Sequence, residues 1–323
     1  DNLKEVLYYS VDENGDYLSG NILEYCKIEY AGNSAISNNG ALRLVTNPFI
    51  NHCTISNNSA PGIRAFGTTS SNFKICNSVI AYNSSIESNA GGIFVSGPLN
   101  ICIQNNTIAH NEGGGISCTS IYGGNVIIEN NIISYNSAWG GGGIGCDGDY
   151  YTKKIKIAHN VITFNHASGS GGGGISATSI DSLGIVGNII SNNSADFNAG
   201  VYGGGYLKNN IIANNTSAST NSGIYCISSG KYQRNSIVNN TAQDNTGAFI
   251  SQYGSPIFQQ NTFAFNTNSN ISENKDMLIK VLNSDPTFTN NNIFENSTSY
   301  SLLLDVAQNS NVISADNNWW GTT

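Results

Sequence analysis

Charged side chains are scarce in this chain of 323 residues. Asp, Glu, Lys and Arg together make up 11% of the sequence, whereas they make up about a quarter of an average soluble protein. Only 13 residues are Lys or Arg, and the net charge is −8. A nucleic-acid-binding surface needs a basic stripe to neutralise phosphates, so the composition argues against nucleic acid as a partner.

Long apolar runs are also missing. No stretch approaches the roughly 18 to 20 apolar residues that a membrane-spanning helix needs, so we expect no membrane insertion. The chain opens without a charged-then-apolar leader and is strand-like from Val6 onwards. We therefore expect residues 1–323 to form a single domain that is a segment of a longer secreted protein.

Asparagine is abundant and recurs in a fixed phrase: Asn, any residue, an aliphatic residue or Phe, two more residues, then usually a second Asn. Looser copies begin at Cys26, Cys53 and Ser78, and full copies at Asn106, Asn131, Asn160, Asn188, Asn210, Asn235, Asn261 and Asn291. The copies return about every 26 residues, and a period in this range is typical of solenoid proteins. The domain is therefore expected to be elongated.

One repeat, residues 99–124, divides at its Asn and Gly residues into three short strands and three turns. No amphipathic helix is visible outside residues 273–282, whose pattern allows one. Each strand must then pair with its counterpart one coil away, and parallel crossovers are right-handed. The sequence predicts an all-β fold, a right-handed parallel β-helix solenoid of about 11–12 coils.

The repeat also assigns residues to places in the coil. The central Ile or Phe of each phrase is expected to face inward in one apolar column, and the Ile of each Gly-Ile-x-x segment in another. The leading Asn is expected at the bend, where it tolerates left-handed backbone and its amide can bond the Asn above and below. Trp319 and Trp320 are candidates for a C-terminal lid. Uncapped coil ends would allow self-association end to end.

The seven cysteines include no Cys-x-x-Cys pair and no cluster with zinc-ligand spacing. Cys26 and Cys53 occupy equivalent repeat positions, as do Cys118 and Cys146. Coils about 4.8 Å apart would allow either pair to form a disulfide. We favour the alternative, a stack of buried thiols, because Cys packs as a small hydrophobe.

Several motifs carry a resemblance to known proteins: Asn-Ser-Ala at residues 136–138 with Gly-Ile-Gly-Cys at 143–146, a related block at 58–63, and Asp-Asn-Asn-Trp-Trp-Gly at 316–321. The chain resembles bacterial secreted right-handed β-helix repeat proteins of the pectin-lyase-like superfamily. The order of the Asn-Ser-Ala and Gly-rich motifs is also similar to that in the repeats of chlamydial polymorphic outer-membrane proteins. The resemblance implies an extracellular or cell-surface location, and it fits the passenger or stalk of an adhesin as well as an enzyme.

In the enzymes of that superfamily that cut acidic polysaccharides, the cleft runs along the outside of the sheet formed here by the Gly-Ile-x-x strands. The lyases carry calcium-binding carboxylates with an Arg or Lys base, and the hydrolases carry clustered Asp with a nearby His. This chain has three Arg and lacks the Asn-Thr-Asp, Asp-Asp and Gly-His-Gly signatures. Both departures count against those activities.

The strongest acidic group is Asp147 with Asp149, and Asp181 follows one coil later. These carboxylates are candidate catalytic residues, as an acid/base pair. Asp147 and Asp149 are also weak candidates for a Ca²⁺ site, the one cofactor that the sequence allows. The simpler alternative, which we favour, is a polar return turn in which Asp and Gly serve turn chemistry.

Aromatic residues collect near the same sheet. Exposed rings can stack on sugar faces, although Tyr is common on any sheet surface. The candidate carbohydrate-binding residues are Phe94, Tyr225 and Phe249 at expected outward strand positions, and Tyr122, Tyr150 and Tyr151 in adjoining turns.

Together these patterns favour a non-catalytic extracellular module for adhesion, for binding a polysaccharide or cell-surface glycan, or for rigid presentation. The alternative is a polysaccharide lyase or glycoside hydrolase that acts on an acidic polysaccharide along the outer sheet.

Overall fold

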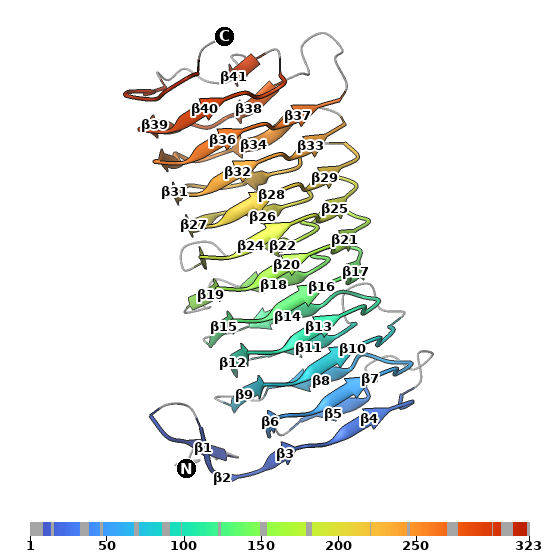
Figure 1. Cartoon of the computed structure of the whole chain (residues 1–323). Coiled ribbons are helices and arrows are strands. Elements are labelled where there is room, and N and C mark those ends of the chain that lie inside the picture. Colours follow the sequence, from blue (N-terminus) through green and yellow to red (C-terminus); the bar gives the residue numbers. More distant parts are fainter. Residues whose placement is uncertain are drawn as a thin grey trace.

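The computed structural model describes residues 9–13, 16–32, 39–45, 48–67, 71–85, 91–97, 99–121, 124–148, 154–178, 183–219, 221–243, 246–269, 277–298, 300–304 and 313–321. All regular structure in these residues is β-strand. The strands stack into a long coil with the two termini at opposite ends (Figure 1).

Three parallel sheets of eleven strands each run along the coil. The first sheet contains β3 (Ile22–Glu24), β6 (Phe49–Asn51), β9 (Ser71–Cys76), β12 (Leu99–Gln104), β15 (Asn125–Glu129), β19 (Lys154–Ala158), β23 (Leu183–Val186), β27 (Gly205–Lys208), β31 (Gly230–Gln233), β35 (Ile257–Gln259) and β39 (Thr287–Thr289).

The second sheet follows the first after a two-residue bend in each coil. It contains β4 (Lys27–Glu29), β7 (Thr54–Ser56), β10 (Val79–Ala81), β13 (Thr107–Ala109), β16 (Ile132–Ser134), β20 (Val161–Thr163), β24 (Ile189–Ser191), β28 (Ile211–Ala213), β32 (Ser236–Val238), β36 (Thr262–Ala264) and β40 (Asn292–Phe294). Next comes a minor sheet of two-residue strands, β17 (Ser137–Ala138), β21 (His166–Ala167), β25 (Ser194–Ala195), β29 (Thr216–Ser217), β33 (Thr241–Ala242) and β37 (Thr267–Asn268).

The third sheet is made by the Gly-Ile-x-x segments. It contains β5 (Leu42–Leu44), β8 (Ile63–Phe66), β11 (Ile93–Ser96), β14 (Ile116–Ile121), β18 (Ile144–Gly148), β22 (Ile175–Ala177), β26 (Val201–Gly203), β30 (Ile224–Cys226), β34 (Thr246–Gln252), β38 (Met277–Leu282) and β41 (Tyr300–Leu304). The parallel solenoid predicted from the sequence is confirmed. The helix allowed for residues 273–282 is wrong for Met277–Leu282, which is strand β38, paired with β34 and β41. Residues 273–276 lie outside the described residues.

The core is a set of apolar columns that run the length of the coil. In the second sheet, Ile108 pairs with Ile133 and Ile133 with Ile162, and all three are fully buried. In the third sheet, Ile116, Ile144 and Ile175 form the equivalent column. Burying aliphatic side chains in register supplies most of the cohesion between coils, and both columns are as predicted.

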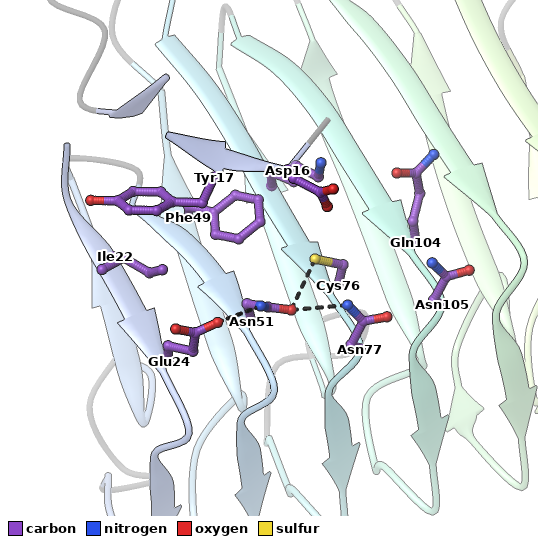
Figure 2. A pocket seen from close by; sticks show the side chains of 11 residues that line it. Asp16, Tyr17, Ile22, Glu24, Phe49, Asn51, Cys76, Asn77, Gln104 and Asn105 are labelled. Atoms are coloured by element: carbon purple, nitrogen blue, oxygen red, sulfur yellow. Dashed lines mark hydrogen bonds between the residues drawn. The ribbon is translucent and has the colours of Figure 1, made fainter. Parts of the chain in front are cut away.

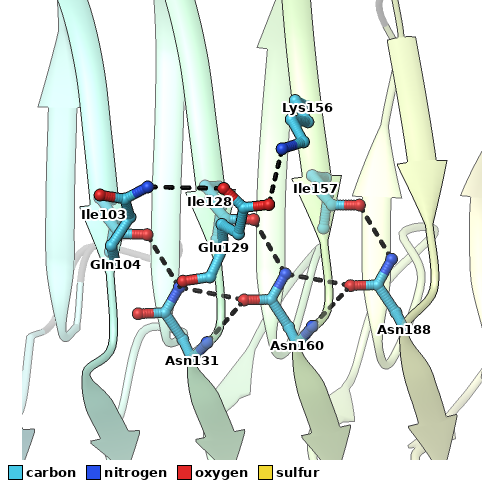
Figure 3. A network of polar contacts seen from close by, with 9 residues as sticks. All are labelled: Ile103, Gln104, Ile128, Glu129, Asn131, Lys156, Ile157, Asn160 and Asn188. Carbon is cyan, nitrogen blue, oxygen red and sulfur yellow. Dashed lines mark hydrogen bonds and ion pairs between the residues drawn. The ribbon is translucent and has the colours of Figure 1, made fainter. Parts of the chain in front are cut away.

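Buried asparagines form a hydrogen-bonded ladder at the bend between the first and second sheets (Figure 3). The backbone N–H and Nδ2 of Asn131 donate to Oδ1 of Asn160 at 2.9 and 3.0 Å, and Nδ2 also donates to the Ile103 carbonyl at 2.9 Å. Asn160 repeats this pattern with Asn188. The amides of this ladder are thereby satisfied, as buried polar groups generally are.

A second ladder, at the bend after the second sheet, joins Asn111, Asn136 and Asn165 in the same way. The left-handed backbone, however, is not at the ladder Asn. It belongs to the residue one position earlier, for example Asn130 with φ 57° and Tyr135 with φ 55°. The expected conformation therefore occurs at each bend, displaced by one residue.

The seven cysteines are free. Cys118 and Cys146 are paired neighbours in the third sheet, and both are buried. Cys53 is buried as well, but Cys26 is only partly buried, so the favoured stack of buried thiols holds for Cys118 and Cys146.

The two ends of the coil differ. Near the N-terminus, β1 (Tyr9–Val11) and β2 (Tyr17–Gly20) form an antiparallel hairpin, and Tyr17 packs against Phe49 on the outside of the first sheet. At the other end, Trp319 pairs with Asn292 and extends the second sheet. Trp319 and Trp320 are both exposed, at 51% and 41%, and the C-terminal lid stays a prediction.

Candidate functional site

The outward face of the third sheet is bulky towards its two ends and low in its middle. Ser117, Gly145 and Ser176 are consecutive paired residues at the outward position of β14, β18 and β22. Phe94 precedes them in this column and Tyr202 follows them. The small side chains therefore form the floor of a depression between two aromatic residues.

This depression is a hollow of about 180 Å³. Its walls are Trp139 on the turn that leads into β18, Tyr202 on β26, and Asp147 on the far side of β18. Four residues with hydroxyl groups, Ser117, Thr119, Ser170 and Ser176, line it together with the glycines 140, 145 and 171. Two rings, several hydroxyls and one carboxylate can recognise a polar ligand that also has an apolar face.

Trp139 is the most exposed wall of the hollow, with 60% of its surface accessible. Its indole lies over the adjacent coil at Gly169, where an added Cβ would come within 2.7 Å of Trp139 Nε1. Gly169 thus makes room for the ring. Local sequence explains the position, because residues 140–143 are all glycine and leave the turn low beside the indole.

Asp147 is exposed on the outward face and accepts a hydrogen bond from Thr178 Oγ1 at 2.7 Å. It is the one charged residue among the described residues that line the hollow. The other predicted acidic candidates, Asp149 and Asp181, lie outside the described residues, as do the predicted aromatic candidates Tyr122, Tyr150 and Tyr151. No acid/base pair or calcium site is therefore assembled from the described residues here.

Phe94 faces outward, as predicted, but part of its ring is already covered. The Arg64 guanidinium carbon lies 4.6 Å from the centre of the Phe94 ring and 5.4 Å from that of Phe66. Arg64 is only 5% exposed, so this is a well-shielded cation–π cluster. Phe94 borders the hollow through this cluster rather than as a free ring.

Tyr225 also faces outward, next to Tyr202, with ring centroids 5.6 Å apart. Its hydroxyl donates to Gln252 Oε1. Burial raises the pKa of Tyr225, and the neighbouring Tyr202 and Tyr253 raise it further. The phenol therefore stays neutral and extends the aromatic surface beyond Tyr202.

Phe249 contradicts its predicted outward position. It pairs with the inward Ile224 and is fully buried, with its ring centroid 4.6 Å from that of Phe258. A register shift in β34 between Thr246 and Phe249 causes the difference. One displaced residue moves a side chain to the other face of a strand, so Phe249 is a core residue.

A second cavity, of about 400 Å³, lies between the N-terminal hairpin and the outside of the first sheet (Figure 2). Asp16, Tyr17 and Phe49 line it beside the Asn51 side chain. The Asn51 amide donates to Glu24 Oε1 at 2.6 Å and its oxygen accepts from Asn77 Nδ2 at 3.0 Å. Nothing in the repeat pattern predicts this cavity, because it depends on where the non-repetitive hairpin packs.

Sequence reasoning also missed Trp139 and Tyr202. Tyr202 has a clear signal, since it occupies the same place after Val201 that Tyr225 occupies after Ile224. Trp139 is the one Trp within the repeats. An unusual residue in a turn of otherwise small residues is the signal that would have marked it.

Among the described residues, no group of three or more His, Cys, Asp or Glu could hold a metal ion. The part of the chain that the structure describes also contains no helix with the length and apolar character to cross a membrane.

Comparisons with known proteins agree with the fold. The family model for the right-handed β-helix region matches residues 11–169 and 121–267. No curated protein and no solved structure gives a significant match. The family match covers most of the chain and agrees with its three parallel sheets, so this protein belongs to the right-handed β-helix family.

Proposed function

We propose that this chain is a non-catalytic extracellular or cell-surface module that binds a neutral oligosaccharide in the hollow on the third sheet. The main support is that Trp139 and Tyr202 form two walls of the hollow, while Ser117, Gly145 and Ser176 form its floor. Sugar rings have apolar faces that pack on aromatic rings and hydroxyls that bond to polar side chains.

Charge supports a neutral ligand. The one charged residue among the described lining residues is Asp147, a carboxylate. A carboxylate repels the uronate groups of acidic polysaccharides but accepts hydrogen bonds from the hydroxyls of neutral sugars. The glycan predicted from the sequence is therefore narrowed to a neutral one, whereas the alternative enzyme would act on an acidic polysaccharide.

Binding is favoured over cleavage because glycoside hydrolysis ordinarily needs two carboxylates that flank the scissile bond. Asp147 is held by Thr178, which suits it for orienting a hydroxyl. A β-helix that is rigid along its length can present such a site away from a surface, which fits an adhesion or presentation role.

The test is calorimetric titration of the full chain with cellohexaose, xylohexaose, maltohexaose and chitohexaose, and with tetragalacturonate as the acidic comparison. Gly145→Val should abolish binding, because an added Cβ at Gly145 meets nothing closer than 3.7 Å and so fills the hollow without strain. Gly184→Val is the matched control, an outward glycine of the first sheet with similar room at 3.9 Å.

We expect at least one neutral hexasaccharide to bind the wild type and Gly184→Val, and none to bind Gly145→Val or Trp139→Ala. Binding by none of the four neutral sugars, or undiminished binding by Gly145→Val, would refute the site. If oligosaccharides were released and Asp147→Asn stopped their release, the chain would be an enzyme instead.

A further inference from the structure

The outer face of the second sheet carries an exposed aliphatic ridge. The first residue of each strand in this sheet points outward, and in the middle of the coil five of these residues are Val or Ile, each 37% to 50% exposed. The ridge consists of Val79, Ile132, Val161, Ile189 and Ile211, with Thr107 between the first two. Exposed apolar residues that are contiguous over several coils mark an interaction surface.

A furrow of small side chains runs beside the ridge. It is formed by the third residue of each strand, which also points outward: Ala81, Ala109, Ser134, Thr163, Ser191 and Ala213. The large residues of the ridge and the small residues of the furrow therefore alternate across the face.

Stacked aromatic rings form the far wall of the furrow. Tyr82, His110, Tyr135 and Phe164 occupy the left-handed bend position on consecutive coils. Their ring centroids are 4.7, 4.8 and 5.0 Å apart, and neighbouring planes differ by 6° or less. Because neighbouring rings cover each other's faces, the ladder presents ring edges to solvent and suits packing better than sugar stacking.

Charge on the strands of this face is confined to one end. Of the outward side chains on the eleven strands of the second sheet, only Lys27 and Glu29 are charged. Both are on β4, where Lys27 Nζ lies 2.8 Å from Glu29 Oε2. Lys27 is at the ridge position of its coil and Glu29 at the furrow position.

We infer that a second copy of this chain covers the face, with the two coils parallel and related by a two-fold axis along their length. This operation places the ridge of each copy in the furrow of the other, so that Ile132 meets Ser134 of the second copy. The same operation brings Lys27 of each copy to Glu29 of the other. An antiparallel pair would instead oppose ridge to ridge and would not bring Lys27 of one copy to Glu29 of the other.

The size of the face is sufficient for a stable dimer. The face comprises the three residues of each strand and one bend residue on either side, which at about 3.3 Å per residue makes it about 15 Å wide. Eleven strands spaced about 4.8 Å apart then give roughly 800 Å² per copy, which is the area that a standard protein interface buries on each partner. The inference is independent of the glycan hollow, which lies on the third sheet.

The test is sedimentation velocity of the full chain over a range of concentrations. We expect the wild type to be a dimer, and Ile132→Lys and Ser134→Glu each to be monomeric because a charge would be buried without a partner. An equimolar mixture of the two variants should dimerise again, since Lys at 132 of one copy meets Glu at 134 of the other. Val161→Lys with Thr163→Glu gives a second such pair.

Ile257→Lys is the control, an exposed outward isoleucine that begins strand β35 of the first sheet. It should remain dimeric, and circular dichroism checks that every variant is folded. A wild type that stays monomeric at its highest soluble concentration would overturn the inference. So would rescue of Ile132→Lys by Val161→Glu but not by Ser134→Glu, which is the pattern of an antiparallel pair.

Discussion

Oδ1 of Asn188 accepts two hydrogen bonds from Asn160, one from its backbone N–H at 2.9 Å and one from its Nδ2 at 3.0 Å. Both residues are buried. The ladder therefore joins main chain and side chain of one coil to the next through a single oxygen atom. Loss of one ladder residue leaves donors on the preceding coil without acceptors.

Asn160→Ala should accordingly lower the free energy of unfolding by about 3 kcal/mol, because buried donors of Asn131 lose their partner. Urea unfolding followed by circular dichroism measures the change. Asn100→Ala is the control: Asn100 also bonds asparagines on both adjacent coils, but it is exposed, so its loss should cost less than about 0.5 kcal/mol. Equal losses for the two variants would contradict the importance of burial.

Phe249→Ala should destabilise the fold by about 3 to 5 kcal/mol, which is the usual cost of removing a buried aromatic ring. The cavity would open beside Tyr232 and Phe258, whose rings lie 5.3 and 4.6 Å from that of Phe249. Tyr225→Ala, on the outward face of the adjacent strand, should cost far less. Thermal unfolding of both variants distinguishes a core Phe249 from a surface one.

Gly169→Ala should displace Trp139, because the added Cβ would lie 2.5 Å from the Trp139 carbonyl oxygen and 2.7 Å from its indole. We expect a changed tryptophan emission spectrum and weaker glycan binding, although Gly169 does not line the hollow. Gly184→Ala, on the first sheet, where an added Cβ meets nothing closer than 3.9 Å, should leave the emission unchanged. An unaltered spectrum for Gly169→Ala would show that Trp139 is positioned differently.

Burial raises the pKa of Cys102 to about 11. Since the thiolate is the reactive form, alkylation of Cys102 by iodoacetamide should be slow at pH 8. Its rate should rise about tenfold per pH unit and level off near pH 11, whereas the unfolded chain should level off near pH 9. Mass spectrometry of the alkylated peptide gives the rate, and a plateau near pH 9 in the folded protein would contradict the shift.

The raised pKa of Cys102 also makes the free energy of unfolding depend on pH. Below pH 9 the thiol is neutral in both the folded and the unfolded chain, so Cys102 contributes no pH dependence. Between pH 9 and 11 only the unfolded chain releases the proton, so the unfolding free energy falls as pH rises. Cys102→Ala should remove this part of the alkaline loss of stability.

The parts of the fold that repeat could be predicted from the sequence, because period and register follow from residues such as Ile133 and Asn131 that recur in every coil. Phe249 was misplaced because the bulge in β34 adds a residue where the repeat gives no signal. Tyr17 and the cavity beneath it depend on a hairpin outside the repeat. Trp139 was missed because its role arises from the small residues around it on neighbouring coils.

The position of the left-handed residues could not be predicted from local preference either. Asparagine has the highest tolerance for this conformation among residues with a side chain, yet the ladder asparagines do not adopt it. The need to keep each ladder amide in line with the next coil outweighs the local preference. His110, Tyr135 and Phe164 adopt the left-handed backbone instead.

This arrangement separates two tasks at every bend. The ladder Asn holds the coils together through buried hydrogen bonds, while the preceding residue supplies the left-handed backbone angle and directs its side chain outward. Tyr25, Asn130, His159 and Arg234 all serve at the bend between the first and second sheets. The edge of the coil is thus a row of outward positions, one per coil, where the side chain can be replaced without altering the core. A ligand-binding strip could therefore be designed there one residue at a time.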